Sequence, residues 1–174
     1  MVGGYAIPEV NRLMNAFMAG ALSVNPDAKF SVNFINSWYD PPKAKEAAFA
    51  MVDAGADILY AERFGVSDAA KERGILAIGN VIDTAADYPG TILASALWHG
   101  EPMIDQAIAD VKDGSFSASD YGIYAFMKYG GSSMVADADL AGADVVAAAE
   151  AKGAEITAGT FEVEIDDTEP SSTM

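Results

Sequence analysis

Aromatic, amide and carboxylate side chains follow several short hydrophobic runs in this sequence. Ligands of open parallel sheets bind beyond the carboxyl ends of the strands, so side chains at these positions are candidates for contact with a solute. Flat rings bordered by amide, hydroxyl and carboxylate groups suit a planar heterocycle or a sugar, because a ring face stacks while a carboxylate accepts hydrogen bonds. The candidate ligand-binding residues are Gly4, Tyr5, Trp38, Glu62, Phe64, Asn80, Asp83 and Trp98.

Several of these candidates also have a purely structural interpretation. Trp38 could be a partly buried aromatic at the start of a helix, and Asp83 could be a helix N-cap. Glu62 and Arg63 could form a solvated ion pair in a loop, of little energetic value. The residue types alone leave these alternatives open.

Signatures of catalysis are weak. The segment VGGYAIP lacks the glycine spacing of a dinucleotide-binding loop, and the chain has neither a P-loop nor the G-x-S-x-G turn of α/β-hydrolases. With no cysteine, a thiol nucleophile is excluded, and a single histidine, His99, disfavours a histidine-based metal centre. We therefore predict no catalytic residue, no metal site and no cofactor.

Short β-branched or aromatic runs alternate with alanine-rich helical patterns along the chain. This alternation predicts an α/β fold, with a Rossmann-like or flavodoxin-like parallel sheet and helices on both faces. Residues 1–165 are expected to form one lobe, and the polar segment 166–174 is expected to be a flexible tail. The expected strands span residues 30–35, 57–60, 75–79, 91–97 and 157–165, and the expected helices span residues 8–24, 41–54, 66–73, 101–113 and 141–152.

The junction after Trp38 predicts the clearest helix boundaries. Asp40 can cap the helix, Pro41 suits its first position, and Gly55 can end it in a left-handed conformation. The beginning of the sheet is less regular, because only MVGGY precedes the first helix. That stretch is short and glycine-rich for a central strand, so we expect either a fragment of a longer chain or another element that completes this edge.

The charge of the chain limits its partners. Twenty-six acidic and ten basic residues give a formal net charge of −16, which would repel a phosphate backbone or an anionic bilayer. Nucleic acid is therefore not an expected partner. No apolar run approaches the length of a membrane span, and the first residues have neither the basic nor the hydrophobic region of a signal peptide.

Four motifs in a fixed order carry a resemblance to a known family. They are the G-x-x-x-P of GGYAIP before a helix that ends in AFMAGALSVNPDAK, the junction SWYDPPKAKEAA, and the segments DAGADIL and AIGNVID. From about residue 3 to about residue 116, the sequence resembles the second lobe of the basic membrane protein family, the purine-nucleoside-type solute-binding proteins of ABC importers. The linked order is specific, because α/β proteins in general do not share VNPDAK followed by WYDPPKAKEAA.

The resemblance implies one lobe of a type I periplasmic-binding-protein clamshell, which closes on a purine nucleoside or base. It implies that Trp38 stacks on the base and that Asp83 lies near the sugar. The implied partners are the solute, an importer permease and a first lobe that this sequence lacks. The implied location is the periplasm or a lipid-anchored position on the cell surface, although the chain carries no signal peptide or anchoring cysteine.

Two departures from the family pattern bear on the ligand. Val81 stands where many members have the first acid of G-x-D-x-D-Q, and Trp98 stands where many have a lysine. The loss of a cation and the gain of an indole would shift the preference from ribosides toward free bases or other planar solutes.

The expected function is therefore binding of a purine-like solute for an ABC importer, with no bond made or broken. The alternative is an α/β enzyme or an intracellular ligand-sensing domain that uses the same lobe, because one architecture hosts many activities. A homo-oligomer formed through the exposed cleft or hinge surface is a third alternative.

Overall fold

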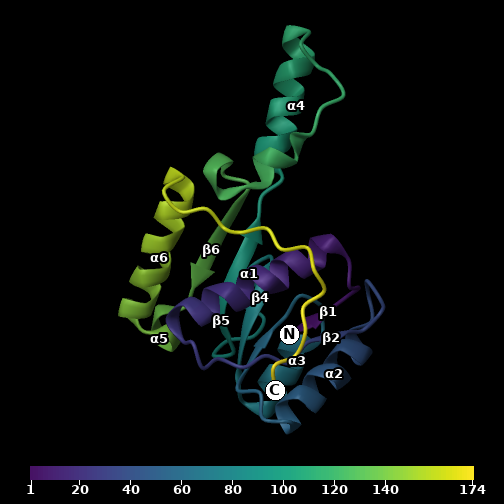
Figure 1. Cartoon of the computed structure of the whole chain (residues 1–174), viewed down its shortest axis with the longest axis vertical. Helices are drawn as coiled ribbons and strands as arrows, with labels where there is room; N and C mark the ends of the chain where they lie inside the picture. The colour runs from purple at the N-terminus through teal and green to yellow at the C-terminus, as the bar shows by residue number, and fades with distance from the viewer. The chain divides into compact units, whose positions relative to one another are not determined.

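The computed structural model describes all 174 residues, which form two compact units (Figure 1). That residues 1–165 form a single lobe stays a prediction. The first unit comprises Met1–Asn80, Thr84–Leu93 and Val163–Met174, and the second comprises Val81–Asp83 and Ala94–Glu162.

A parallel sheet forms the centre of the first unit. Its strands are β1 (Val2–Gly3), β2 (Asn33–Phe34), β3 (Ile58–Tyr60) and β4 (Leu76–Val81). Strand β1 pairs with β2, and β3 pairs with β4, in both cases in parallel. A parallel bridge between Val2 and Ala61 joins the two pairs, which gives the strand order β2-β1-β3-β4. The predicted parallel sheet is confirmed.

Helices pack on both faces of this sheet, as the sequence predicts. They are α1 (Pro8–Val24), α2 (Pro41–Asp53) and α3 (Val66–Arg73). Successive residues of a strand point to opposite faces, so Leu59 and Tyr60 enter two separate apolar clusters. Tyr60 packs in the cluster that contains Met14 of α1, and Leu59 packs in the cluster that contains Ala48 of α2 and Ala69 of α3.

The predicted boundaries of α2 are confirmed. The Asp40 side chain accepts a hydrogen bond from the amide of Lys43 at 3.1 Å, and Pro41 occupies the first helical position. Gly55 follows the helix with φ +106°, a conformation that L side chains rarely adopt. The helix therefore begins directly after the segment that carries Trp38.

The carboxyl-terminal segment contacts α1 and the residues that lead into β2 (Figure 1, yellow). That residues 166–174 form a flexible tail stays a prediction. Arg12 pairs with Asp167 at 2.9 Å, and the amide of Phe30 donates to the Thr173 hydroxyl at 2.9 Å. Side chains of α1 and backbone groups of the residues just before β2 thus supply partners for this polar segment.

The second unit contains an antiparallel strand pair. Strand β5 (Ile92–Trp98) pairs with β6 (Ser132–Ala136), and Ala94 lies opposite Ala136. The other elements are α4 (Glu101–Asp113), the 3-10 helices Tyr121–Ala125 and Met127–Tyr129, α5 (Ala138–Ala141) and α6 (Ala143–Ala158).

One prediction about this part of the chain is wrong, and one strand was missed. Strand β6 was not predicted, because its five residues follow a glycine pair and are too few to show a clear alternation. The strand predicted at 157–165 does not form, because α6 continues to Ala158 and residues 159–165 are irregular. Gly159, with φ +73°, ends α6.

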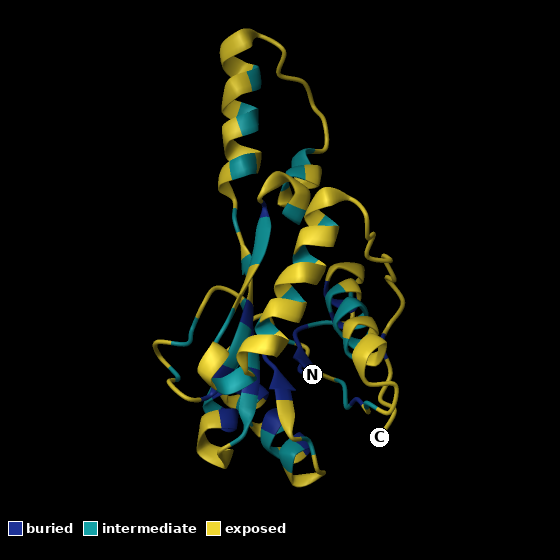
Figure 2. Ribbon diagram, turned by 90° about the vertical axis from the view of Figure 1, so that its left-hand side faces the viewer, coloured by how far each residue is buried: buried dark blue, intermediate teal, exposed yellow.

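The second unit has almost no buried core of its own. Only Ser95 and Gly131 are buried in it, and α4 has no buried residue (Figure 2). Ile104, Ile108 and Val111 are exposed, and their spacing places them on one face of α4. None of the helices is both long enough and apolar enough to cross a lipid bilayer.

Candidate ligand-binding site

The carboxyl ends of β1, β2 and β3 define the candidate site in the first unit. The chain passes from β1 through α1 to β2 on one side, whereas β3 lies on the other side of β1. Ligands of doubly wound sheets bind where the strand order changes direction in this way. Gly4, Trp38 and Glu62 follow β1, β2 and β3 respectively, so the sequence placed these three residues correctly at the ends of strands.

Glu62 links the ends of β1 and β3. The amide of Gly4 donates to its Oε2 atom at 3.0 Å, and Nε of Arg63 donates to the same oxygen at 2.8 Å. The Nη2 atom of Arg63 pairs with Oε1. The Glu62 side chain is only 3% exposed and that of Arg63 is 19% exposed. The interpretation of these residues as a solvated loop pair is therefore wrong.

Trp38 lies at the surface of the site and not in the core, with 49% of the residue exposed. The Tyr5 ring centre is 4.9 Å from the Trp38 ring centre, at an interplanar angle of 55°. The guanidinium carbon of Arg63 lies 5.3 Å from the indole centre, and its Nη1 donates to the Trp38 carbonyl at 2.7 Å. Tyr5, Arg63 and Gly4 thus contact the indole, while about half of Trp38 stays accessible to solvent.

Gly4 permits this arrangement because it has no side chain. A Cβ atom at this position would lie 3.0 Å from Cε3 of Trp38 and 3.2 Å from the Ser37 carbonyl oxygen. Such distances are tighter than ordinary van der Waals contact, so a larger residue would displace the indole. The close contact with Trp38 thus explains why the second residue of the Gly3–Gly4 pair is a glycine.

Asn80, the residue before the last of β4, carries a buried amide group. Its Nδ2 and Oδ1 atoms are both buried and have no hydrogen-bond partner in the protein. Buried amides of native proteins are almost always paired, so Asn80 has a donor and an acceptor available for a ligand. Phe64 is exposed, and its ring meets that of Tyr39 edge-on at 6.1 Å between centres.

Asn36 and Val81, both near the carboxyl ends of strands, have positive φ angles that the sequence did not indicate. Asn36, which follows β2 by two residues, has φ +54°, and Val81 at the end of β4 has φ +73°. Asparagine tolerates the left-handed region, whereas a β-branched valine there is strained. Such strain is concentrated at functional sites in proteins, and nothing in the residue type of Val81 marks it in the sequence.

The two remaining predicted site residues belong to the second unit. Asp83 is exposed, and no helix begins at it, so its interpretation as a helix N-cap is wrong. Trp98 ends β5 opposite Ser132 and is 47% exposed. That Asp83 and Trp98 contribute to the same site as Trp38 stays a prediction.

Tyr60 lies directly beneath the site at the end of β3. Burial raises the pKa of its phenol well above the usual value, and the negative charge of Glu62 adds to this effect. Its ring stacks on Phe17 of α1 at 4.8 Å between centres. The folded protein therefore keeps Tyr60 neutral at pH values at which an unfolded chain would ionise it.

This difference predicts an alkaline loss of stability that depends on Tyr60. A group with a raised folded-state pKa contributes stability that is complete below the unfolded pKa of about 10 and is lost above it. Between pH 8 and pH 11, the free energy of unfolding of the native protein should fall by about 1.4 kcal/mol more than that of Tyr60→Phe. Urea unfolding of both proteins at the two pH values measures this change. An equal difference at pH 8 and pH 11 would contradict it.

Comparison with known proteins assigns the chain to a family. The sequence profile of the ABC transporter substrate-binding proteins described as PnrA-like, also called the Bmp family, matches residues 1–125. The chain belongs to this family. The resemblance seen in the four sequence motifs is thereby confirmed.

Curated relatives of this chain carry names of solute-binding proteins. A purine-binding protein of Brucella abortus is 39% identical over 121 residues, which cover 67% of this chain and 34% of the relative. A protein of Haloferax volcanii that is named as an ABC transporter glucose-binding protein is 34% identical over 119 residues, which cover 67% of this chain and 30% of the relative. The matched part of the chain thus spans about a third of each of these two relatives.

Solved structures show the same fold. A solute-binding protein of an ABC transporter system from Conexibacter woesei superposes with a TM-score of 0.72 and 23% identity, covering 94% of this chain and 56% of that one. A transcriptional activator of the comK gene from Bacillus halodurans gives a TM-score of 0.73 at 22% identity, covering 92% and 56%. The fold is that of one lobe of a periplasmic binding protein, as predicted.

Proposed function

We propose that this chain is part of the solute-binding component of an ABC-type importer and that it binds a purine nucleoside or nucleobase-like solute. The observation that carries this proposal is the half-exposed Trp38 indole, held at the switch point of the sheet by Gly4, Tyr5 and Arg63. An accessible indole offers a stacking surface for a planar ring. Solute binding of this kind makes and breaks no bond, so the chain is not an enzyme.

The chemistry of the site favours a purine over a simple sugar. The relative from Brucella abortus is named as purine-binding and the one from Haloferax volcanii as glucose-binding, so names alone leave both classes open. A purine combines a flat ring for Trp38 with edge donors and acceptors for the Asn80 amide, which is buried and unpaired.

The partners of the chain are a second lobe and an importer permease. The exposed apolar stripe of Ile104, Ile108 and Val111 on α4 supports a protein contact, because large exposed apolar patches mark interaction surfaces. The solved structure from Conexibacter woesei is covered only to 56%, which leaves room for another lobe in such proteins. Solute would favour the closed state of the two lobes, which the permease recognises outside the cytoplasmic membrane.

A ligand-sensing role inside the cell is the second candidate. The structural likeness to the comK transcriptional activator from Bacillus halodurans favours it, with a TM-score as high as that of the transporter protein. That likeness concerns the fold, which hosts both activities. The family match over residues 1–125 is to substrate-binding proteins, and for this reason transport is the function we propose.

A calorimetric titration separates these proposals. The full-length product of the gene should bind guanosine or adenine and should not bind glucose at the same concentration. Binding of glucose without binding of either purine would overturn the proposed ligand class. The sensing role would replace the transport role if the gene product carried a DNA-binding domain.

A further inference from the structure

We infer that Glu62 and Arg63 form a positioning pair that holds the Trp38 indole in place for the solute. The inference rests on the proposed function for its biological purpose, but its structural part concerns this chain alone. From the sequence, Glu62 is a candidate for ligand contact and Arg63 is not. The structure assigns both residues to the support of Trp38.

Three of the five N–H donors of Arg63, one on each nitrogen, are already used inside the protein. Its Nε donates to the Glu62 carboxylate and to the Glu62 carbonyl oxygen, at 2.8 and 3.0 Å. Its Nη1 donates to the Trp38 carbonyl at 2.7 Å, and its Nη2 pairs with Glu62. A guanidinium engaged on three sides is fixed in orientation, because its planar fork matches a carboxylate. Arg63 is therefore a support for Trp38 and not a free cation for an anionic solute.

The Glu62 carboxylate is likewise committed. It accepts from the amide of Gly4 at 3.0 Å in addition to Arg63, and it is almost fully buried. Gly4 in turn lies against the indole, where only a glycine fits without displacing it. One carboxylate thus fixes both the backbone beside Trp38 and the cation above its ring.

The consequence for recognition concerns geometry and charge. Arg63 occupies part of the indole surface, so a solute must stack on the accessible remainder, and the indole needs little further ordering when the solute arrives. Ordering a flexible side chain on binding weakens affinity, so a preformed indole strengthens it. The opposite charges of Glu62 and Arg63 offset each other, which leaves no net charge beside the indole from this pair and suits an uncharged ring.

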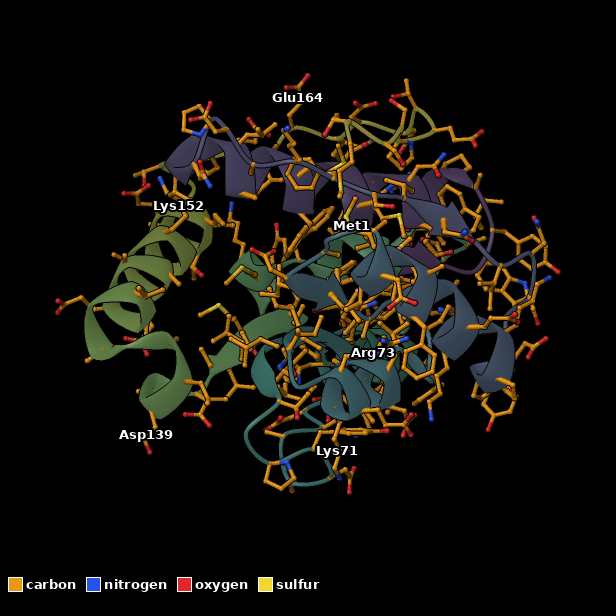
Figure 3. All side chains as sticks on the ribbon, turned by 90° about the horizontal axis from the view of Figure 1, so that it is seen from below. Met1, Lys71, Arg73, Asp139, Lys152 and Glu164 are labelled. Carbon is orange, nitrogen blue, oxygen red and sulfur yellow. The ribbon has the colours of Figure 1, made fainter.

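A matched control exists in the same unit. Arg73 of α3, which is labelled in Figure 3, lies over the Phe49 ring at 4.6 Å and pairs with Asp53 at 2.8 Å. It therefore combines an ion pair with a cation–π contact, as Arg63 does. Phe49 and Arg73 are not at the strand ends that define the site. Arg73→Met therefore removes a more exposed ion pair and a cation–π contact without touching Trp38.

The test uses the full chain in a Trp98→Phe background, so that Trp38 is the sole tryptophan. The variant Glu62→Gln/Arg63→Met removes both charges together, which avoids leaving Glu62 buried and unpaired, and its new amide side chain keeps an acceptor for Gly4. Acrylamide quenching of Trp38 fluorescence without solute should increase in this variant and stay unchanged in Arg73→Met. Guanosine affinity of the full-length gene product should fall about 2- to 10-fold in the double variant.

The outcomes separate the two proposals. Unchanged quenching in the double variant, with folding verified by circular dichroism, would overturn the positioning role. Increased quenching with unchanged guanosine affinity would support the positioning role and would remove Trp38 stacking from the proposed function. Arg63→Lys keeps the cation but not the planar fork of the guanidinium. If Trp38 in this variant is quenched no more than with the native pair, charge alone suffices and the role of the bidentate geometry is overturned.

Discussion

Replacing Arg63 alone with methionine is expected to lower the free energy of unfolding by about 3 to 5 kcal/mol. The change leaves the Glu62 carboxylate, which is 3% exposed, without its charged partner. A buried charge that loses its partner is strongly destabilising, whereas an exposed ion pair contributes little. Urea unfolding at pH 7 measures the difference from the native chain.

Two further variants separate burial of charge from loss of contact. Glu62→Gln/Arg63→Met should recover most of the lost stability, because no unpaired charge is left. Arg73→Met should cost less than about 1 kcal/mol, because Arg73 and Asp53 are both substantially exposed. If Arg63→Met and Arg73→Met prove equally mild, the Glu62–Arg63 pair is solvated in solution and the account of the site is wrong.

Gly65→Ala is expected to destabilise the fold by about 2 to 5 kcal/mol. Gly65 precedes α3 with φ +99°, in a region unfavourable for any L side chain. A Cβ atom there would lie 2.2 Å from the carbonyl oxygen of Pro41, the first residue of α2. Because the obstacle is backbone, relief of the clash must move α2 or α3, and both begin beside the site.

Gly74→Ala is the control for this prediction. Gly74 ends α3 with φ +67°, but a Cβ atom there would have no neighbour within 4 Å. Gly74→Ala should lower the free energy of unfolding by about 1 to 2 kcal/mol, because only the left-handed backbone conformation is unfavourable for alanine there. Thermal or urea unfolding of both variants measures the difference, and an equal loss in the two would mean that α2 and α3 do not approach each other at Gly65.

Local rules predicted the parts of the fold that depend on nearby residues. The cap at Asp40, the stop at Gly55 and the buried alanines of α2 follow from residue preferences and helical spacing, and the structure confirms them. Strand β6 was missed because antiparallel pairing with β5 is a contact between distant parts of the chain. The contacts of the carboxyl-terminal segment could not be predicted for the same reason, since its partners lie on α1 and in the residues just before β2.

The candidate site was predicted in part. The rule that ligands bind beyond strand ends selected Gly4, Trp38 and Glu62, which lie together in the structure. The same rule could not distinguish a residue that contacts solute from one that supports a neighbour, because both follow a strand. Arg63 was considered only as a solvated partner of Glu62, since burial of a charged pair depends on tertiary packing. The one sequence signal for it is an adjacent acid and base directly after a short strand.

The most direct measurement of the central claim is the guanosine affinity of the full-length gene product with Trp38→Ala and with Trp38→Phe. Stacking of a base on an aromatic ring contributes about 1 to 3 kcal/mol, so Trp38→Ala should weaken binding about 5- to 150-fold. Trp38→Phe should retain most of the affinity, because it keeps a ring at the same position. Native affinity in Trp38→Ala, measured by calorimetry on a folded protein, would contradict the account.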